Sequence, residues 1–320
     1  MSFVLPSQIS NDLSVLEIGL RELLYSNVEF IQLIADDLIS AGGKRFRPAL
    51  VFLGARALGL DADSHLVNVA MAVELLHSAT LLHDDLVDNA QLRRGKEAAF
   101  RRYGNAVSVL SGDFLLSRVL KLLSQLPSSL TEEFAQTSMR ICEGEVLQFQ
   151  MAAYGTYQIS DYLEVITAKT AVLVATALRA PALLTSQPIH VLDALTQYGL
   201  SYGRAFQMRD DFLDLMATCE DWGKPIGSDL KEGKVTLPVL YLLQGPFEKA
   251  TLEILKRRAS EPGDVDSIRT WLIETGGVEH IRSEIHKEVT LAVLALDALP
   301  ETPERNTLEQ LARYETSRMS

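Results

Sequence analysis

Two segments of the 320-residue chain share the pattern Asp-Asp-x-x-Asp within strongly apolar sequence. One runs from Asp84 to Asp88 and the other from Asp210 to Asp214. Residues four apart lie on one face of a helix, so each carboxylate pair would project together. Neighbouring buried carboxylates repel each other unless a cation lies between them. Oxygen ligands without a cysteine or histidine set nearby favour a hard ion, so we predict that the pairs Asp84 with Asp88 and Asp210 with Asp214 bind Mg²⁺.

Protein-bound Mg²⁺ is commonly shared between carboxylates and the phosphate groups of a substrate. We therefore predict that the two acidic motifs face each other and hold a diphosphate through bridging Mg²⁺. The alternative is that each motif is a solvated acidic face or a set of charges at a helix N-terminus. One such motif alone would favour this alternative, whereas two motifs in apolar helices favour the metal site.

Positive charge is concentrated close to both acidic motifs. The chain has 30 Lys and Arg against 42 Asp and Glu, a formal net charge of −12, so an anionic ligand must be held by local cations or by metal. Arginine binds phosphate oxygens in pairs, and lysine adds a point charge. These cations lie in residues 42–48, 93–94, 169 and 224–234. Each segment alone is typical of a solvated loop, but the position of residues 93–94 and 224–234 just after the two motifs favours binding.

His77 lies seven residues before Asp84, two helical turns away on the same face. A single histidine on an apolar helix is more often a core residue than a ligand contact. Because His77 points toward the acidic motif, we predict that it contacts the ligand. His83 points elsewhere and is predicted to be structural.

The elements that must position these side chains are predicted to be helices. Apolar residues recur at spacings of three and four, no segment alternates with period two, and no Asn-Gly hairpin signal occurs. We therefore predict an all-α protein with one domain over residues 1–320. The predicted helical segments include residues 65–83, 106–123, 131–151, 160–178, 191–216, 235–244, 248–258 and 265–296.

Composition excludes several other classes of protein. The acidic balance disfavours a general nucleic-acid binder, and Cys142 and Cys219 are too few for a disulfide framework. Charged residues interrupt every long apolar window, and the first residues lack the pattern of a signal peptide. These features predict a soluble, cytoplasmic protein without stable membrane insertion.

Taken in order, these and several further motifs resemble the trans-type polyprenyl diphosphate synthases, particularly the long-chain, octaprenyl or solanesyl type. The resemblance covers roughly residues 38–245. It implies an isoprenoid synthase-like helical bundle around a deep central cavity, usually a homodimer. The matching segments are GGKRFRP at 42–48, ELLHSATLLHDDLVDNAQLRRG at 74–95, GNAVSVLSGDFLL at 104–116, EGEVLQ at 143–148, KT at 169–170, FQMRDDFLD at 206–214 and GKPIGSDLKEGKVTLPV at 223–239.

The resemblance implies a Mg²⁺-dependent 1′-4 head-to-tail transfer of an allylic group to isopentenyl diphosphate, with the released diphosphate as proton acceptor. Contacts to the allylic diphosphate would come from Arg93, Lys169, Thr170, Gln207 and Lys224. Contacts to isopentenyl diphosphate would come from Lys44, Arg47, His77 and Arg94. Lys234 matches a basic residue near the diphosphates. The resemblance also implies about three Mg²⁺ ions, with ligands from Asp84, Asp88, Asp210, Asp211 and Asp214. The cations that would stabilise charge on the departing group, and that we assign as catalytic, are Lys169, Lys224 and Lys234.

Arg209 stands where many long-chain members carry an aliphatic residue. One position before Asp210, it points about 100° away from it on a helix. It would therefore pair with another acid or reach the rim of the cavity.

The length of the product depends on the helix that carries Asp84. Thr80 lies about 6 Å below Asp84, Ala79 is its neighbour, and Leu76 lies about 12 Å below. Small side chains at 79 and 80 would leave a tunnel open, and the first motif lacks the two-residue insertion of many bacterial short-chain relatives. Both features favour a product of about C30 to C50 for quinone side chains, and Ala79→Tyr is predicted to shorten it to about C15–C20.

Other functions stay open at this point. A short-chain farnesyl or geranylgeranyl diphosphate synthase would share the same motifs, and a partner subunit of a heteromeric synthase would share the fold. A class I terpene cyclase usually carries an Asn/Ser/Glu second metal motif and has no need of Lys44, Arg47 and Arg94. The retained acidic motifs also argue against a non-catalytic subunit or a purely structural bundle.

Overall fold

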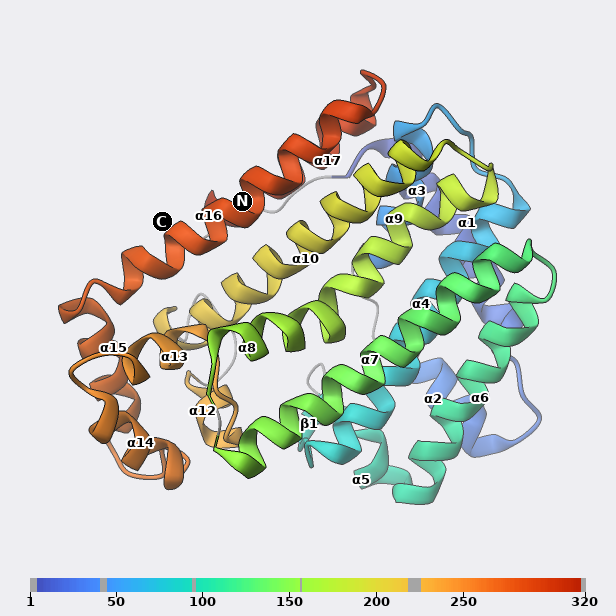
Figure 1. Cartoon of the computed structure of the whole chain (residues 1–320). Coiled ribbons are helices and arrows are strands. Elements are labelled where there is room, and N and C mark those ends of the chain that lie inside the picture. Colours follow the sequence, from blue (N-terminus) through green and yellow to red (C-terminus); the bar gives the residue numbers. More distant parts are fainter. Residues whose placement is uncertain (1–4, 41–44, 94–95, 156, 218–225, 318–320) are drawn as a thin grey trace. The chain divides into compact units, whose positions relative to one another are not determined.

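The computed structural model describes residues 5–40, 45–93, 96–155, 157–217 and 226–317. Three predicted site residues, Lys44, Arg94 and Lys224, lie outside these ranges. In the described part of the chain, helices are joined by short turns, and the one pair of strands is a two-residue antiparallel hairpin (Figure 1). The all-α prediction is confirmed, while the small hairpin was not predicted.

The helices of the first part of the chain are α1 (Ser7–Leu23), α2 (Glu29–Ser40), α3 (Phe46–Ala57), α4 (Ser64–Val87), α5 (Ala99–Tyr103), α6 (Asn105–Leu123) and α7 (Ser128–Tyr154). The hairpin strands are β1 (Leu92–Arg93) and β2 (Lys96–Glu97). The later helices are α8 (Ile159–Ile166), the π-helix η1 (Thr167–Ala171), α9 (Val172–Leu184), α10 (Ile189–Met216), α12 (Ser228–Glu232), α13 (Leu237–Leu243), α14 (Glu248–Lys256), α15 (Asp264–Glu274), α16 (Gly277–Ala295), the 3₁₀ turn η2 (Leu296–Ala298) and α17 (Pro303–Ser317).

The contacts divide the chain into two compact units. Unit 1 comprises residues 1–138, 173–196 and 298–308, and unit 2 comprises residues 139–172, 197–297 and 309–320. Helices α7, α9, α10 and α17 and the short turn η2 contribute residues to both units. The prediction of one domain over the whole chain stays a prediction.

Helix α4 is the central element of unit 1. It begins after Asp63, whose side chain accepts a hydrogen bond from the Leu66 backbone N–H and so caps the helix. Its residues are buried on nearly all sides because α1, α3 and α6 pack against it. It is long and apolar enough to span a membrane, but 67% of its most apolar window is buried, which is typical of the core helix of a soluble protein.

In unit 2, α13 packs with α14, α15 and α16. The segment 265–296 was predicted as one helical stretch, and that prediction was wrong in one respect. The chain breaks after Glu274 and restarts at Gly277, because Gly276 adopts a left-handed conformation with φ 73°. Gly277 also lies close to the Tyr241 ring, where a Cβ would approach to 2.8 Å.

Candidate active site

The first acidic motif lies at the C-terminal end of α4, in unit 1. Asp84 is half-buried, Asp85 is buried at 3% exposure, and Asp88 is exposed at the helix end. The motif becomes more exposed toward its end because α4 ends at Val87 and the chain turns at Asn89, whose φ is 50°. Asp84 lies in the last turn of α4 and Asp88 directly follows the helix.

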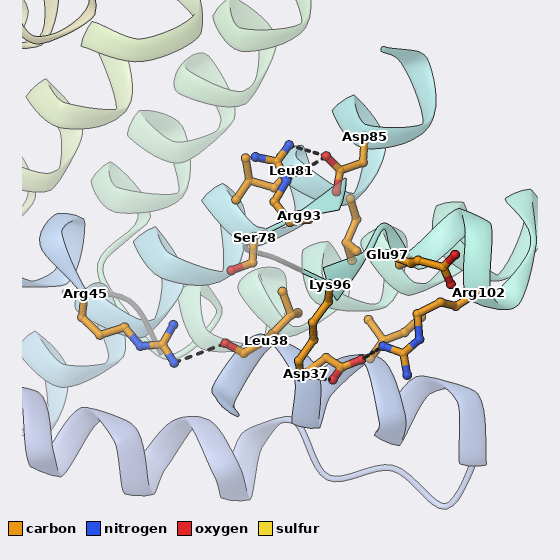
Figure 2. A pocket seen from close by; sticks show the side chains of 13 residues that line it. Asp37, Leu38, Arg45, Ser78, Leu81, Asp85, Arg93, Lys96, Glu97 and Arg102 are labelled. Carbon is orange, nitrogen blue, oxygen red and sulfur yellow. Dashed lines mark hydrogen bonds and ion pairs between the residues drawn. The ribbon is translucent and has the colours of Figure 1, made fainter. Parts of the chain in front are cut away.

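The middle aspartate of this motif is already paired. Asp85 Oδ1 accepts hydrogen bonds from Arg93 Nε, at 2.8 Å, and from the Arg93 Nη2. Arg93 lies on β1, so its ion pair with the buried Asp85 attaches the hairpin to α4 (Figure 2). The Arg93 side chain remains 43% exposed, which leaves part of the guanidinium available to an anion.

A second contact fixes the other strand of the hairpin. Asp37, on α2, accepts hydrogen bonds from Lys96 Nζ at 2.8 Å and from the Arg102 guanidinium (Figure 2). Burial raises the pKa of Asp37, but these two hydrogen bonds outweigh it and the pKa is lowered. The hairpin, α2 and α5 are thus joined by charge around a pocket lined by apolar and charged side chains.

The predicted isopentenyl diphosphate contacts begin in α3. Arg47 Nη1 lies 2.9 Å from His77 Nε2, so these two predicted contacts are brought together. Thr80 donates a hydrogen bond to the His77 carbonyl at 2.8 Å. Arg45, in the same GGKRFRP motif as Arg47, is buried by ion pairs to Glu17 and Glu74 and has a structural role. His83, also predicted to be structural, packs where Gly112 of α6 leaves space.

The second acidic motif lies on α10, in unit 2. Asp211 is buried, and both of its oxygens accept hydrogen bonds: Oδ2 from Tyr162 at 2.7 Å and Oδ1 from Gln207 at 2.8 Å. Gln207 Oε1 in turn accepts a hydrogen bond from the Thr170 hydroxyl at 2.9 Å. Two predicted contacts, Thr170 and Gln207, therefore belong to one network with Asp211.

The π-helix η1 presents Lys169 and Thr170. Lys169 Nζ lies 2.7 Å from Glu145 and 2.5 Å from Gln148, both within the EGEVLQ segment of α7. Glycines allow α7 and α10 to approach η1 closely. A Cβ at Gly144 would lie 2.6 Å from the Ala168 Cβ, and one at Gly203 would lie 2.5 Å from the Ala171 Cα. Isolated π-helical turns are frequent at functional sites.

The acidic cluster of unit 2 extends beyond the motif. Asp214 accepts hydrogen bonds from the backbone N–H groups of Ser228, at 3.3 Å, and Asp229, at 3.2 Å. Burial and the charges of Asp211 and Asp214 raise the pKa of Asp229 to about 8. Lys234, a predicted catalytic cation, forms an ion pair with Glu232 at 2.7 Å. Its positive charge lowers the pKa of Asp229, but by less than burial and the neighbouring carboxylates raise it.

Burial also raises the pKa of Asp211 to about 6, and the charges of Asp210 and Asp214 act in the same direction. The cluster therefore carries more negative charge than its neighbouring cations offset. Hard oxygen donors with excess negative charge fit a divalent cation such as Mg²⁺. Among the described residues, however, no group of three or more acidic, histidine or cysteine side chains is already arranged to hold an ion.

The structure thus assembles the predicted residues in two groups. In unit 1 these are Arg47 with His77 and Arg93 with the first motif, and in unit 2 they are Lys169 near Thr170, Gln207 and the second motif. Sequence reasoning missed the partners Asp37, Tyr162 and Asp229. Asp229 had a signal, since it lies in the GSDLKEGK segment that matches the family motif, whereas a buried tyrosine 49 residues from Asp211 has none.

Comparison with known proteins identifies the family to which the chain belongs. The family model described as polyprenyl synthetase matches residues 28–272. The octaprenyl diphosphate synthase of Escherichia coli (strain K12) is 36% identical, with 97% of this chain and 96% of the relative covered. The geranylgeranyl diphosphate synthase of Methanosarcina mazei is 35% identical, with 99% of both chains covered.

A similar fold is found in a solved structure. The crystal structure of a polyprenyl synthase from Caulobacter crescentus CB15, complexed with calcium and isoprenyl diphosphate, is similar with a TM-score of 0.90. It is 36% identical to this chain, and 100% of both chains is covered.

Proposed function

This chain belongs to the polyprenyl synthetase family and is therefore a prenyltransferase, and we propose that it condenses isopentenyl diphosphate with an allylic diphosphate by 1′-4 head-to-tail transfer. The observation that carries the proposal is the acidic cluster of unit 2, where Tyr162 and Gln207 orient Asp211 and the backbone N–H groups of Ser228 and Asp229 bind Asp214. The uncompensated negative charge of this cluster favours a divalent cation and, through it, a diphosphate.

The proposed Mg²⁺ ligands are Asp84, Asp88, Asp210, Asp211 and Asp214. When bound, Mg²⁺ supplies Lewis acidity that neutralises charge on the leaving diphosphate. Of these ligands, Asp211 is oriented by Tyr162 and Gln207. That both motifs grip one diphosphate, and that about three ions take part, remain predictions from the sequence.

The proposed roles of the other side chains follow from their charge. Lys169, Lys224 and Lys234 would stabilise the departing diphosphate, together with Arg93, Thr170 and Gln207. Lys44, Arg47, His77 and Arg94 would hold isopentenyl diphosphate. An apolar surrounding would exclude water from the allylic cation. The proton lost after bond formation would pass to the released diphosphate, since no other base is assigned.

The reaction is tested by incubating the protein with Mg²⁺, labelled isopentenyl diphosphate and each allylic primer, followed by chromatography of the products. We expect elongated prenyl diphosphates whose formation stops when a chelator removes the metal. Asp84→Asn and Asp210→Asn should each reduce kcat by roughly 10²-fold or more. Absence of elongation with every primer in the wild-type protein would contradict the proposal and favour a partner subunit that needs a second chain.

We further propose that the product is long, about C30 to C50, because the small side chains below Asp84 would leave a tunnel open for a growing prenyl chain. Leu76, Ala79 and Thr80 lie on α4 below Asp84, and none has a bulky aromatic ring. Ala79 is completely buried, whereas Thr80 is half-buried on the stripe of His77 and Asp84. The reported relatives include both octaprenyl and geranylgeranyl synthases, so a short-chain product is the competing outcome.

Product length is tested with Ala79→Tyr and Thr80→Tyr. Each ring would occlude the predicted tunnel, and the products should shorten to about C15–C20. Ala79→Tyr should also lower the thermal stability, because a buried site must accommodate a larger side chain at a cost of about 1–3 kcal/mol. Unchanged chain length in both variants would refute the assignment of these residues to the tunnel wall.

The proposed assembly is a homodimer in the cytoplasm. Met139, Val146 and Phe149 lie on one stripe of α7 and are between 49% and 57% exposed, and such a stripe favours contact with a second copy. Val146→Glu should convert the dimer to a monomer in sedimentation experiments. Ile273→Glu, at an exposed apolar residue of α15, should leave the dimer intact.

A further inference from the structure

Arg209 is the residue of the second motif whose role the predicted reaction does not use. It is only 2% exposed, although arginine is rarely buried without partners. Its guanidinium carbon lies 4.5 Å from the centre of the Phe206 ring. Its Nε and Nη2 both donate to Oδ1 of Asp210, the Nε at 3.1 Å, so the arginine reaches the neighbouring carboxylate despite the expected angle between them.

The other side of the guanidinium contacts the last helix of the chain. Arg209 Nη1 donates to Oε2 of Glu315 on α17, and the Tyr202 hydroxyl donates to Oε1 of Glu315 at 2.8 Å. The Glu315 side chain is 2% exposed. All of these residues belong to unit 2, and α10 and α17 are shown in yellow and red in Figure 1.

Burial of such a pair is not explained by stability alone. Replacing a buried ion pair with apolar residues is often neutral or stabilising, whereas removing one partner is strongly destabilising. The effect of the pair on the neighbouring Asp210 carboxylate offers another reason for its burial.

The charges show what that effect would be. Arg209 contributes one positive charge between two carboxylates, Asp210 and Glu315, so the three side chains together keep one negative charge. Without the charge of Glu315, Arg209 would neutralise Asp210. With Glu315 present, Arg209 orients Asp210 through one oxygen while the negative charge needed to attract a cation is retained. The Asp210 side chain is 32% exposed and accessible to a ligand.

We propose that Arg209 and Glu315 are positioning residues that fix the Asp210 carboxylate and preserve its charge for metal binding, so that the C-terminal part of α17 forms part of the site's support. This inference rests on the proposed function, because it assigns Asp210 as a metal ligand. It adds a role for the last helix that the acidic motifs alone do not predict.

The test uses the full-length protein and measures binding of Mn²⁺, in the presence of inorganic pyrophosphate, by calorimetry. Glu315→Gln removes one negative charge while keeping the shape of the side chain. We expect it to weaken Mn²⁺ binding by roughly 5- to 20-fold, as for the loss of one nearby charge. Steady-state assays should show a similar rise in the Mg²⁺ concentration needed for half-maximal rate, with kcat at saturating Mg²⁺ nearly unchanged.

The double variant Arg209→Leu/Glu315→Leu separates charge from folding. It removes the positive and the negative charge together, so the metal-free protein should unfold close to the wild-type temperature, while Arg209→Leu alone should unfold earlier. Its Mn²⁺ affinity should exceed that of Glu315→Gln, because Asp210 is no longer neutralised. This readout remains informative even if Glu315→Gln folds poorly.

A matched control is the ion pair between Arg204 of α10 and Glu288 of α16, at 2.9 Å. Glu288→Gln should change thermal stability but leave Mn²⁺ affinity at the wild-type value. Equal Mn²⁺ affinities for wild type, Glu315→Gln and the double variant would overturn the inference and leave the pair purely structural. A wild-type protein that neither binds Mn²⁺ with pyrophosphate nor elongates a primer would instead refute the proposed function.

Discussion

At the scale of single residues, Tyr162 has a clear influence on the acidic cluster. Its side chain is fully enclosed by protein, and its hydroxyl donates to Asp211 Oδ2, which lowers the pKa of that aspartate against the effect of burial. Burial and the neighbouring Asp211 in turn raise the pKa of Tyr162 itself, so the phenol remains a donor throughout the physiological range.

Tyr162→Phe is therefore expected to raise the pKa of Asp211 above about 6. Because metal binding needs the ionised carboxylate, the acid limb of the pH profile of kcat/KM should move to higher pH. The loss of activity should be roughly 5-fold near pH 6.5 and smaller at pH 8. Tyr198→Phe, at another fully buried tyrosine, should leave this limb in place, and a uniform loss at every pH would contradict the prediction.

At the scale of elements, the close approach of α10 to η1 is the contact on which Lys169 and Thr170 depend. Gly203 lies against Ala171, and a Cβ there would approach the Ala171 Cα to 2.5 Å, a distance that backbone atoms cannot tolerate. Gly203→Ala should push η1 away from α10 and break the hydrogen bond between Thr170 and Gln207.

We expect Gly203→Ala to lower kcat/KM by roughly 10-fold or more and the free energy of unfolding by about 1–3 kcal/mol. Kinetics and urea unfolding measure the two effects separately. Gly263→Ala is a useful comparison. Gly263, just before α15, has φ 90°, a conformation that alanine rarely adopts, but no atom lies within 4 Å of its Cβ position. It should reduce stability without a comparable loss of kcat/KM.

The hairpin that carries Arg93 is a second element whose placement can be tested. Asp37 joins α2 to Lys96 of β2 and to Arg102 of α5. Asp37→Asn should loosen the hairpin and raise the KM for the allylic diphosphate several-fold, with a smaller change in kcat, because Arg93 would be less well oriented. Amide hydrogen exchange should increase in β1 and β2 and not in α13.

The lowered pKa of Asp37 also makes the stabilisation by this contact depend on pH. Since the folded-state pKa is lowered, its stabilisation is complete above about pH 4 and is lost as the pH falls through the folded-state value. Wild type and Asp37→Asn should therefore differ in thermal stability at pH 7 and converge in strong acid. A constant difference down to pH 2 would show that the charge of Asp37 is not responsible.

At the scale of the whole molecule, local patterns were enough to predict the helices and the motif residues. Periodicity and spacing depend on neighbouring residues, so the stripes on α4 and α10 could be predicted from the sequence alone. Contacts between segments that are distant in the sequence could not be predicted in this way. Glu315 lies 106 residues from Arg209 in a helix of polar composition, and nothing in its own surroundings indicates that it is buried.

The same limit applies to the conformation of the π-helix and the hairpin. The Lys169-Thr170 pair could be singled out by its match to the family, but η1 depends on how closely Gly144 and Gly203 allow two other helices to approach. The break at Gly276 was missed because the apolar spacing continues across it. Sequence periodicity thus predicts which residues are helical better than where a helix is interrupted.

The acidic cluster should make global unfolding of the metal-free protein depend on pH. In the folded state the pKa of Asp211 is about 6 and that of Asp229 about 8, compared with 3.8 for an unperturbed aspartate. Between pH 6 and 8 the folded protein therefore binds more protons than the unfolded chain, and stability falls as the pH rises. We expect the Tm without metal to drop by roughly 3 °C or more over this interval.

Metal should reverse this trend, because a bound cation replaces the protons. Added Mg²⁺ with inorganic pyrophosphate should raise the Tm more at pH 8 than at pH 6, where protons compete with it. Asp229→Asn removes the group with the higher pKa, so this variant should lose most of the pH dependence and be more stable than wild type at pH 8 without metal. An unchanged slope in Asp229→Asn would mean that repulsion across the whole acidic chain, with its net charge of −12, controls the stability instead.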